Sequence, residues 1–462
     1  MSQLPTYFGP RTAVVPARNA HALALWRARD GLLSPATDST PVTAGFGSLG
    51  ISQRYAKDSL GGLYRIPQYM PNVECWDLDG DGICESPALR VTTAGHGNWC
   101  AYSEDFTNWT AVNTPAILAP TLTLGEVMLS LLSDTSGTLQ SYYERTPSAI
   151  GLTGCRGVLS FLVAKGNINA AGGSGVILYD NTAAANRIAS TWTWTTSSAG
   201  IQTPNVTVTT GQILSKEYMG RRTYLHQTTK LLQTVDVWRI QIRSTTGYVD
   251  ANSHRIRVLP ANTAAQQGNE FFGAVQLSAL PGPYFKTTAS TGGAEIDRWS
   301  MAFNPTPQAL TLAVRFVYTG TTYCLPSAAA TGLVCAITND AGAAPYLWLM
   351  QGDGAGTVGY RVQVHDGTNT LGVNNTTQPQ PGDVVLLRAV LLADSSLKLG
   401  VSLNGGTEVV ATSGNPYGLP TAWVTSAALR LTEGATYGGE AYLGIGVFAG
   451  EPSAAYIEDV LS

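Results

Sequence analysis

An aspartate-rich turn is the first place where residue types and spacing in this sequence suggest chemistry. Three aspartates two residues apart precede Gly82, which matches the start of a calcium loop, D-x-D-x-D-G. Ala88 stands at the twelfth position, where such a loop has a bidentate glutamate, although a glutamate occupies the ninth. The predicted ligands are Asp77, Asp79, Asp81 and Glu85. The alternative is a plain Asp-Gly hairpin turn, which these residues favour for backbone reasons alone.

The sequence contains no recognisable pattern of residues for acid–base or nucleophilic catalysis. Glu104 and Asp105 are adjacent, so on a strand their side chains point in opposite directions and cannot flank one glycosidic bond. None of the five histidines stands in a nucleophile motif, and no GxxxxGK[ST], GxSxG or HExxH pattern occurs. His365, followed by Asp366 and Gly367, fits a strand that runs into a turn. We therefore predict no catalytic residues and no enzyme.

Aromatic residues are the candidates for sugar binding, because the C–H faces of a sugar stack on exposed rings. Trp192 and Trp194 are two apart in STWTWTT, so they share one face of a strand. Tyr142 and Tyr143 lie on opposite faces, so we expect only one of them to be exposed. These four residues are the predicted glycan-binding residues. Core packing is the alternative for each of them, since Trp is highly buried on average.

The six cysteines include no CxxC pair, which argues against a structural zinc site. Cys75 and Cys84 flank a glycine-rich turn, and Cys324 and Cys335 flank the loop LPSAAATGLV. Either pair can close a hairpin as a disulfide in an oxidising compartment. The alternative is that they are buried free thiols.

Composition favours an all-β protein. Charged residues make up only 13% of the chain, about half the usual fraction, and glycine, proline, serine and threonine are abundant. The hydrophobic fraction of 44% is too high for disorder. A net charge of −4 without a Lys/Arg run argues against nucleic-acid binding. No apolar run is long enough to span a membrane, and the N-terminus lacks the pattern of a signal peptide, so we expect no membrane insertion.

Short strands are the elements that must position these residues. ALALWRARDGLL near the N-terminus fits either a short helix or a strand. Residues 50 to 92 predict successive hairpins, and residues 111 to 285 predict about nine strands, as in a sandwich or jelly roll. No helix-period segment interrupts them, so a nucleotide-binding βαβ fold is not supported.

The strand pattern restarts after a Pro/Gly/Thr-rich crossing at residues 282 to 299. In LTLAVRFVYT the residues Leu312, Val314 and Phe316 face one way, which predicts a buried face. The C-terminal PSAAYIEDVLS fits a short helix. This second half predicts another sandwich of about 165 residues.

The stretch NWCAYSEDFTNWT, residues 98 to 110, resembles a recurrent module of tailed-bacteriophage virion proteins. The matching residues are Tyr102, Ser103, Glu104, Asp105, Phe106, Asn108 and Trp109. Residues 97 to 101 depart from the family, which has Arg-Thr-Asn-Leu-Leu there. Downstream, VWRI at 237 to 240 is similar to the family's W-y-R-i strand, and GAVQL with PGPYF at 273 to 285 is similar to its closing pattern. The resemblance covers roughly residues 50 to 299.

The resemblance implies a jelly roll similar to carbohydrate-binding modules, and the second half is similar to a laminin-G or concanavalin-A-like sandwich. We therefore predict two tandem antiparallel β-sandwiches after an N-terminal segment rich in hairpins. The predicted divisions are 1–95 for docking and hairpins, 96–290 for the jelly roll and 291–462 for the second sandwich. Phe106 and Trp109 are expected to pin the entry of the chain into the jelly roll.

The predicted function is that of a non-enzymatic structural protein on a phage particle, as a head decoration, fibre, spike or tail surface component. Its expected partners are other virion proteins and further copies of itself. The alternative is a glycan-binding adhesin on the same scaffold, and a third hypothesis is a jelly-roll enzyme acting on glycosides. We expect the protein on the virion surface, assembled in the host cytoplasm, with no cofactor unless the aspartate-rich turn binds calcium.

Overall fold

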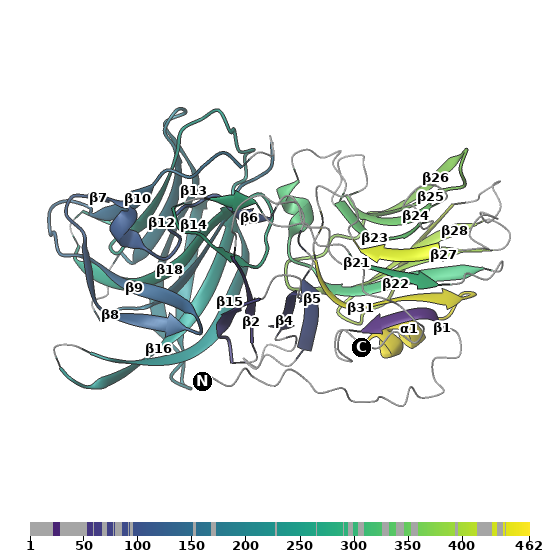
Figure 1. Ribbon diagram of the computed structural model, residues 1–462, viewed down its shortest axis with the longest axis horizontal. Coiled ribbons are helices and arrows are strands. Elements are labelled where there is room, and N and C mark those ends of the chain that lie inside the picture. The colour runs from purple at the N-terminus through teal and green to yellow at the C-terminus, as the bar shows by residue number, and fades with distance from the viewer. Residues whose placement is uncertain are drawn as a thin grey trace.

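The computed structural model shows an almost entirely β protein of two lobes (Figure 1). It describes residues 22–27, 53–58, 60–66, 72–76, 78, 86–90, 92, 96–150, 154–167, 172–226, 229–264, 266–289, 291–293, 299–303, 309–325, 332–338, 346–352, 359–392, 396–413, 427–431, 438 and 440–462.

The first lobe is a sandwich of two antiparallel six-stranded sheets. One sheet has the spatial order β14 (Gln202–Thr210), β13 (Ala185–Thr196), β12 (Ser174–Asp180), β17 (His254–Leu259), β10 (Tyr142–Arg145), β7 (Thr110–Val112). The other has the order β15 (Gln212–Leu225), β16 (Leu232–Arg243), β11 (Val158–Lys165), β18 (Gly268–Ser278), β9 (Val127–Asp134), β8 (Ala116–Leu124). The chain passes repeatedly between the sheets, as in a jelly roll. Alternation sets the core: Val176 and Leu178 are buried, while Ile177 and Tyr179 are partly exposed.

The second lobe is also a sandwich of antiparallel sheets. The first sheet has the order β29 (Val409–Ser413), β28 (Leu397–Leu403), β27 (Val384–Leu391), β22 (Leu310–Val317), β31 (Ala441–Ala449), β5 (Ser86–Arg90), β4 (Asn72–Trp76), with β1 (Ala22–Arg27) also paired to β31. The second has the order β21 (Trp299–Phe303), β30 (Ala427–Leu431), β23 (Gly332–Thr338), β24 (Tyr346–Gln351), β25 (Tyr360–His365), β26 (Thr370–Asn375). The predicted face of Leu312, Val314 and Phe316 lies in the core between them.

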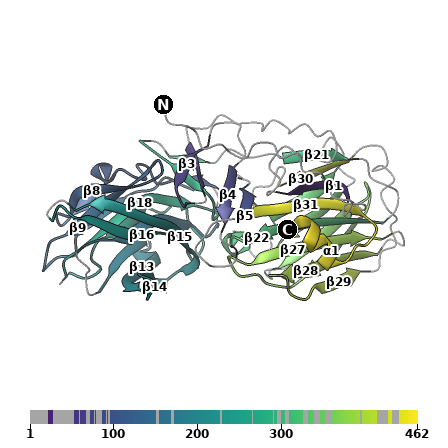
Figure 2. The ribbon, with the colours of Figure 1, turned by 90° about the horizontal axis from the view of Figure 1, so that it is seen from below.

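Strands from the N-terminal part of the chain are built into both lobes. The segment whose type the sequence left open is a strand, β1, which pairs with β31 beside the C-terminal helix α1 (Ala454–Leu461). Strands β2 (Gln53–Lys57) and β3 (Leu63–Arg65) form a small sheet with β19 (Tyr284–Lys286). That sheet packs on the first sandwich, whereas the β4–β5 hairpin extends a sheet of the second. Figures 1 and 2 both show β4 and β5 between the lobes.

The stretch at residues 98–110 ties the entry of the jelly roll to its exit. Strand β6 (Gly97–Asn98) pairs with β20 (Gly292–Gly293). The Asn98 amide donates to the backbone oxygens of Val275 and Phe285, at 3.1 and 2.9 Å. The carboxylate of the buried Glu104 accepts from the Tyr284 hydroxyl at 2.8 Å and from the Lys286 ammonium at 2.9 Å. This stretch therefore has a structural role, because its polar side chains form hydrogen bonds with backbone and side-chain groups of residues 275–286 at the end of the domain.

A short 3-10 helix, η3 (Phe106–Asn108), follows in the same stretch. Asp105 caps it by accepting from the backbone N–H of Thr107 at 3.1 Å. Phe106 and Trp109 are buried with ring centroids 4.9 Å apart, and the indole N–H donates to the Tyr102 carbonyl at 2.9 Å. The two rings therefore hold the chain where it enters the sandwich.

Gly282 lies just before β19, at a position where the structure has no room for a side chain. A Cβ at this position would lie 2.2 Å from Cδ2 of the buried His96. We expect Gly282→Ala to lower the free energy of unfolding by about 1–3 kcal/mol, because the rigid ring cannot move aside. Gly137→Ala is the control, since no atom lies within 4 Å of its added Cβ, and it should change stability by less than about 0.5 kcal/mol. Equal urea midpoints for the two variants would contradict this packing.

Candidate functional site: a charged cleft between the sandwiches

A cleft of about 660 Å³ lies where the two sandwiches and the N-terminal strands meet. We call it the junction cleft. Its walls come from β2, β4 and β5, from β15 and β16 of the first sandwich, and from the end of β22 and residues 381–382 of the second. Its size falls in the range of small-molecule pockets, about 300–1,000 Å³.

Five buried or partly buried charges line the junction cleft: Lys57, Glu74, Arg90, Glu217 and Arg239. Sheet geometry brings them together from separate parts of the chain. Glu217 of β15 and Arg239 of β16 are directly opposite in the antiparallel register. Glu74 lies opposite Ala88, so it shares a face of the β4–β5 hairpin with Arg90.

These charged side chains differ in how completely their hydrogen-bonding groups are paired. Lys57 forms an ion pair with Glu217. The Arg239 guanidinium donates to the Gly282 carbonyl at 2.6 Å and to the Ser160 hydroxyl at 3.2 Å. The Arg90 guanidinium donates through Nη2 to the Pro281 carbonyl at 2.8 Å. Among the described residues, however, its Nε and Nη1 groups have no hydrogen-bond partner although they are buried.

The surroundings shift the pKa values of Glu74 and Glu217 in opposite directions. Burial raises the pKa of Glu74, and the nearby Arg90 and Arg239 only partly oppose it. Burial also disfavours the charged form of Glu217, but Lys57 and Arg239 outweigh it and leave the pKa of Glu217 below its usual value. The cleft therefore holds one carboxylate that stays charged and one that tends to bind a proton.

Aromatic rings lie at the edge of the junction cleft, and two of them belong to the opposite face of the β15–β16 pair from its buried charges. Trp238 and Tyr218 lie with ring centroids 5.2 Å apart, and the Trp238 indole donates to the Gln202 carbonyl at 2.7 Å. The Lys216 ammonium lies over the Trp238 ring, 5.6 Å from its centroid. Trp76 also lines the cleft, and its buried indole N–H has no partner among the described residues. Alternation places Trp238, Tyr218 and Lys216 on the side of β15 and β16 that faces the core of the first sandwich, whereas Glu217, Arg239 and Gln241 lie on the other side.

The tryptophan pair predicted to bind glycan lies instead in the interior of the first sandwich. Trp192 is 1% exposed, between Phe161 and Phe272 with ring centroids at 5.5 and 5.8 Å. Trp194 is half-buried, and both indoles donate to Oε1 of Glu270, at 2.9 and 2.7 Å. The prediction of an exposed tryptophan platform is therefore wrong. The two rings do share one face of the strand, but it is the face that the opposite sheet covers.

The two tyrosines lie on opposite faces of β10, as the alternation requires. Tyr143 is buried, and its hydroxyl donates to the Pro115 carbonyl at 3.1 Å, so it cannot stack on a sugar. Tyr142 is partly exposed on the outer face of the sheet, with the Arg257 guanidinium 5.2 Å from its ring centroid. The structure thus separates Tyr142 from the tryptophans with which it was grouped.

The predicted calcium ligands Asp77, Asp79, Asp81 and Glu85 lie outside the described residues, and so does Cys84, the predicted partner of Cys75. Within the described part of the chain, no group of three or more His, Cys, Asp or Glu side chains is placed to hold a metal ion. Calcium binding at the aspartate-rich turn stays a prediction.

The predicted disulfide between Cys324 and Cys335 is not present, because both residues are buried free thiols. Cys324 packs against Val158 and Leu214 at the contact between the sandwiches. Cys335 lies in the core of the second sandwich. Burial raises the pKa of both thiols, which keeps them protonated and unreactive.

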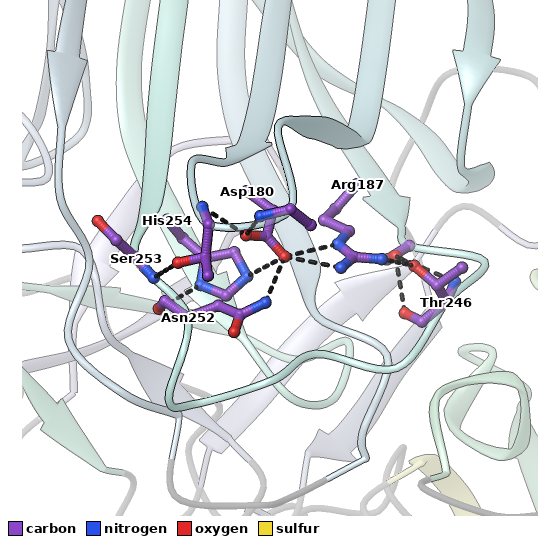
Figure 3. A network of polar contacts seen from close by, with 9 residues as sticks. Asp180, Arg187, Thr246, Asn252, Ser253 and His254 are labelled. Atoms are coloured by element: carbon purple, nitrogen blue, oxygen red, sulfur yellow. Dashed lines mark hydrogen bonds and ion pairs between the residues drawn. The ribbon is translucent and has the colours of Figure 1, made fainter.

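A buried polar network at one end of the first sandwich holds loops together (Figure 3). Asp180 accepts from the Arg187 guanidinium at 2.7 Å and from the Asn252 amide at 2.8 Å, and its Oδ2 lies 3.7 Å from Nε2 of His254. Burial opposes the charged form, but the backbone N–H of Ala183 and the donors of Asn252 and Arg187 outweigh it and bring the pKa of Asp180 to about 2. His254 stacks on Tyr248 with ring centroids 4.0 Å apart, and burial lowers its pKa. This aspartate–histidine pair therefore anchors the β12–β13 turn to the start of β17.

Sequence reasoning did not single out the charges of the junction cleft. Four of the five lie in segments predicted to be strands, and Arg239 stands in the VWRI motif, whereas Glu217 lies in β15, which was not among the predicted strands. The available signal was polar residues on one face of strands whose other face is apolar, as in WRIQIR. That signal is also typical of a solvent-facing sheet, so only the packing of β2, β4 and β5 distinguishes the two.

Comparison with known proteins gives no family. No protein-family model and no curated protein matches the chain. Among solved structures, the chain is similar to the mouse laminin alpha1 chain, domains LG4-5, at 10% sequence identity and a TM-score of 0.21, over 74% of this chain and 93% of that one. A superposition at that score supports no argument, so the class follows from the sheets themselves. The protein is an all-β protein of two antiparallel sandwiches. In the described residues no helix has the length and apolarity needed to cross a bilayer.

The buried Glu270 predicts a pH dependence of stability. Burial raises its pKa to about 8, although the two indole N–H groups oppose the shift. The folded chain therefore holds a proton that the unfolded chain releases near pH 4.5, and stability falls as pH rises from about 4.5 to about 8, by about 1.4 kcal/mol per pH unit. Glu270→Gln keeps an acceptor for both indoles without the proton. Its melting temperature should fall less between pH 5 and pH 8 than that of the wild type, and parallel curves would contradict the assignment.

Proposed function

We propose that the chain is a non-enzymatic structural protein on the surface of a tailed-phage particle, in a head-decoration, fibre, spike or tail position. The observation that carries the proposal is the way the N-terminal strands are built into both sandwiches. Strand β2 lies on the first sandwich, while β1, β4 and β5 extend a sheet of the second. Two sandwiches joined by shared strands suit a protein that keeps a fixed shape within an assembly.

The resemblance of residues 50–299 to a phage virion module supports the same proposal. Exposed leucines offer a contact for neighbouring proteins or further copies. The long β15–β16 hairpin (Figure 1) carries Leu225, Leu231 and Leu232 near its turn, with 52, 66 and 74% of their surface exposed. Apolar side chains grouped at such a turn are typical of surfaces that another protein covers.

A glycan-binding adhesin on the same scaffold is the second candidate. The junction cleft favours it, because its charged groups can orient sugar hydroxyls and the Trp76 ring lies on the same face of the β4–β5 hairpin as Glu74 and Arg90. The two candidates are compatible, since a structural protein of a particle surface is also placed to meet the host.

Purified particles test the structural proposal. We expect mass spectrometry to find the chain in particles at a fixed ratio to the major capsid or tail protein, and labelled antibodies to decorate the particle surface. The Leu231→Asp/Leu232→Asp variant should fold normally, because both side chains are exposed, yet enter particles less efficiently. Leu139→Asp, at another exposed position, is the control. A chain absent from particles would contradict the proposal.

A further inference from the structure

The face of the β4–β5 hairpin that looks into the junction cleft carries donors without acceptors. Alternation places Glu74, Trp76 and Arg90 on this face, whereas Leu89 on the other face lies in the core of the second sandwich. Arg90 is 3% exposed, yet its Nε and Nη1 groups have no hydrogen-bond partner within the part of the chain that the structure describes. The same holds for the buried indole N–H of Trp76. Buried donors are nearly always paired, so acceptors are missing at two places on this face.

The two places lie at opposite ends of the hairpin face. In the antiparallel register the pair of Glu74 and Ala88 lies between the row of Arg90 and the row of Trp76. Ala88 belongs to an apolar cluster with Val317 and Trp76, and Val317 also lines the cleft. A ligand that meets both sets of donors therefore needs an acceptor at each end and an apolar middle.

The buried charges around this face do not balance. Besides burial, Arg90 acts on the pKa of both Glu74 and Glu217, which places its guanidinium among the charges of the cleft. Glu217 pairs with Lys57, whereas no ion pair joins Glu74 to a cation among the described residues. Burial raises the pKa of Glu74 and favours its neutral form. Lys57, Arg90 and Arg239 then face Glu217 alone, which leaves an excess of positive charge. Unbalanced buried charge is costly, so negative charge on a ligand stabilises this arrangement.

We propose that the junction cleft binds a small dicarboxylate, in which a short methylene chain joins two carboxylates. One carboxylate takes the unpaired donors of Arg90, the other takes the indole N–H of Trp76, and the chain lies over Ala88. The two negative charges balance the excess of the cleft. All of these contacts lie on one face of the hairpin, and none involves Trp238 or Tyr218, which belong to the opposite side of the β15–β16 pair. This inference goes beyond the structural role and does not depend on it.

Calorimetric titration of the full-length chain tests the proposal. The probes are succinate, adipate and suberate at equal ionic strength, because they share two carboxylates and differ only in chain length. We expect one chain length to bind more tightly than the others. Its monomethyl ester keeps the length but loses one charge, so it should bind about tenfold more weakly or worse, because a charge-assisted hydrogen bond is lost.

Several results of this titration would overturn the proposal. They are equal affinity for the diacid and its monomethyl ester, equal affinity for all chain lengths, and no binding of any diacid at millimolar concentration. Tighter binding of a neutral methyl galactoside than of any diacid would also overturn it, because the cleft would then serve the glycan-binding candidate.

Matched variants locate the site. Arg90→Met should weaken binding of the tightest diacid about tenfold or more. Arg388→Met controls for the loss of a buried arginine, because Arg388 has its own ion pair in the second sandwich. Trp76→Phe keeps a ring and removes the indole donor, so it should weaken binding several-fold. Trp238→Phe is its control and should leave binding unchanged, because that indole donates to the Gln202 carbonyl and lies on the other side of β16.

Glu74→Gln keeps the test valid if Arg90→Met does not fold. The carboxamide is neutral, like the protonated carboxyl group, so the variant should bind the diacid at least as tightly as the wild type. A loss of about tenfold would contradict the charge balance on which the proposal depends. If the chain is found in particles but no variant changes diacid binding, the cleft assignment fails and the structural role stands. Diacid binding through Arg90 by a chain that is absent from particles would have the reverse meaning.

Discussion

The constraint on which this structure depends is the pairing of charges inside the junction cleft. Lys57 has 6% of its side-chain surface exposed and relies on Glu217 for its counter-charge. Arg239 relies on the Gly282 carbonyl of the exit loop and on the Ser160 hydroxyl. Breaking a buried ion pair costs far more than the pair contributes, so these charges act mainly to fix one arrangement of the parts. Each charge comes from a different strand, and another packing of β2 on the first sandwich would separate Lys57 from Glu217.

The charges of the junction cleft explain why the N-terminal strands do not form a separate unit. The β4–β5 hairpin buries Leu89 in the core of the second sandwich and presents Glu74 and Arg90 to the first. The exit loop at Pro281 and Gly282 accepts from Arg90 and Arg239 together. The junction cleft therefore lies where the N-terminal strands and the two sandwiches meet.

Sequence periodicity predicted the strands and the two sandwiches well, because alternation in segments such as LTLAVRFV follows directly from the pleat. Periodicity could not show which face of a strand is buried and which is exposed. Trp192 and Trp194 share a face in either interpretation, and only the opposite sheet decides that this face is buried. The cleft could not be predicted either, since Lys57 and Glu217 are 160 residues apart and meet through the packing of β2 on β15. The Cys324–Cys335 pairing failed for the same reason: proximity in sequence did not place the two thiols in one core.

Scanning calorimetry of Glu217→Gln tests most directly whether the buried charges couple the lobes. We predict that the wild type unfolds in one cooperative transition. The variant leaves Lys57 buried without a counter-charge, so it should lose about 2 kcal/mol or more and unfold in two separate transitions. Glu451→Gln removes the partner of the more exposed Lys398 and a 3.7 Å contact of Arg388, which keeps Glu408 as its counter-charge. It should keep one transition with a loss of at most about 1 kcal/mol. Two transitions already in the wild type, or the same behaviour in both variants, would contradict the account.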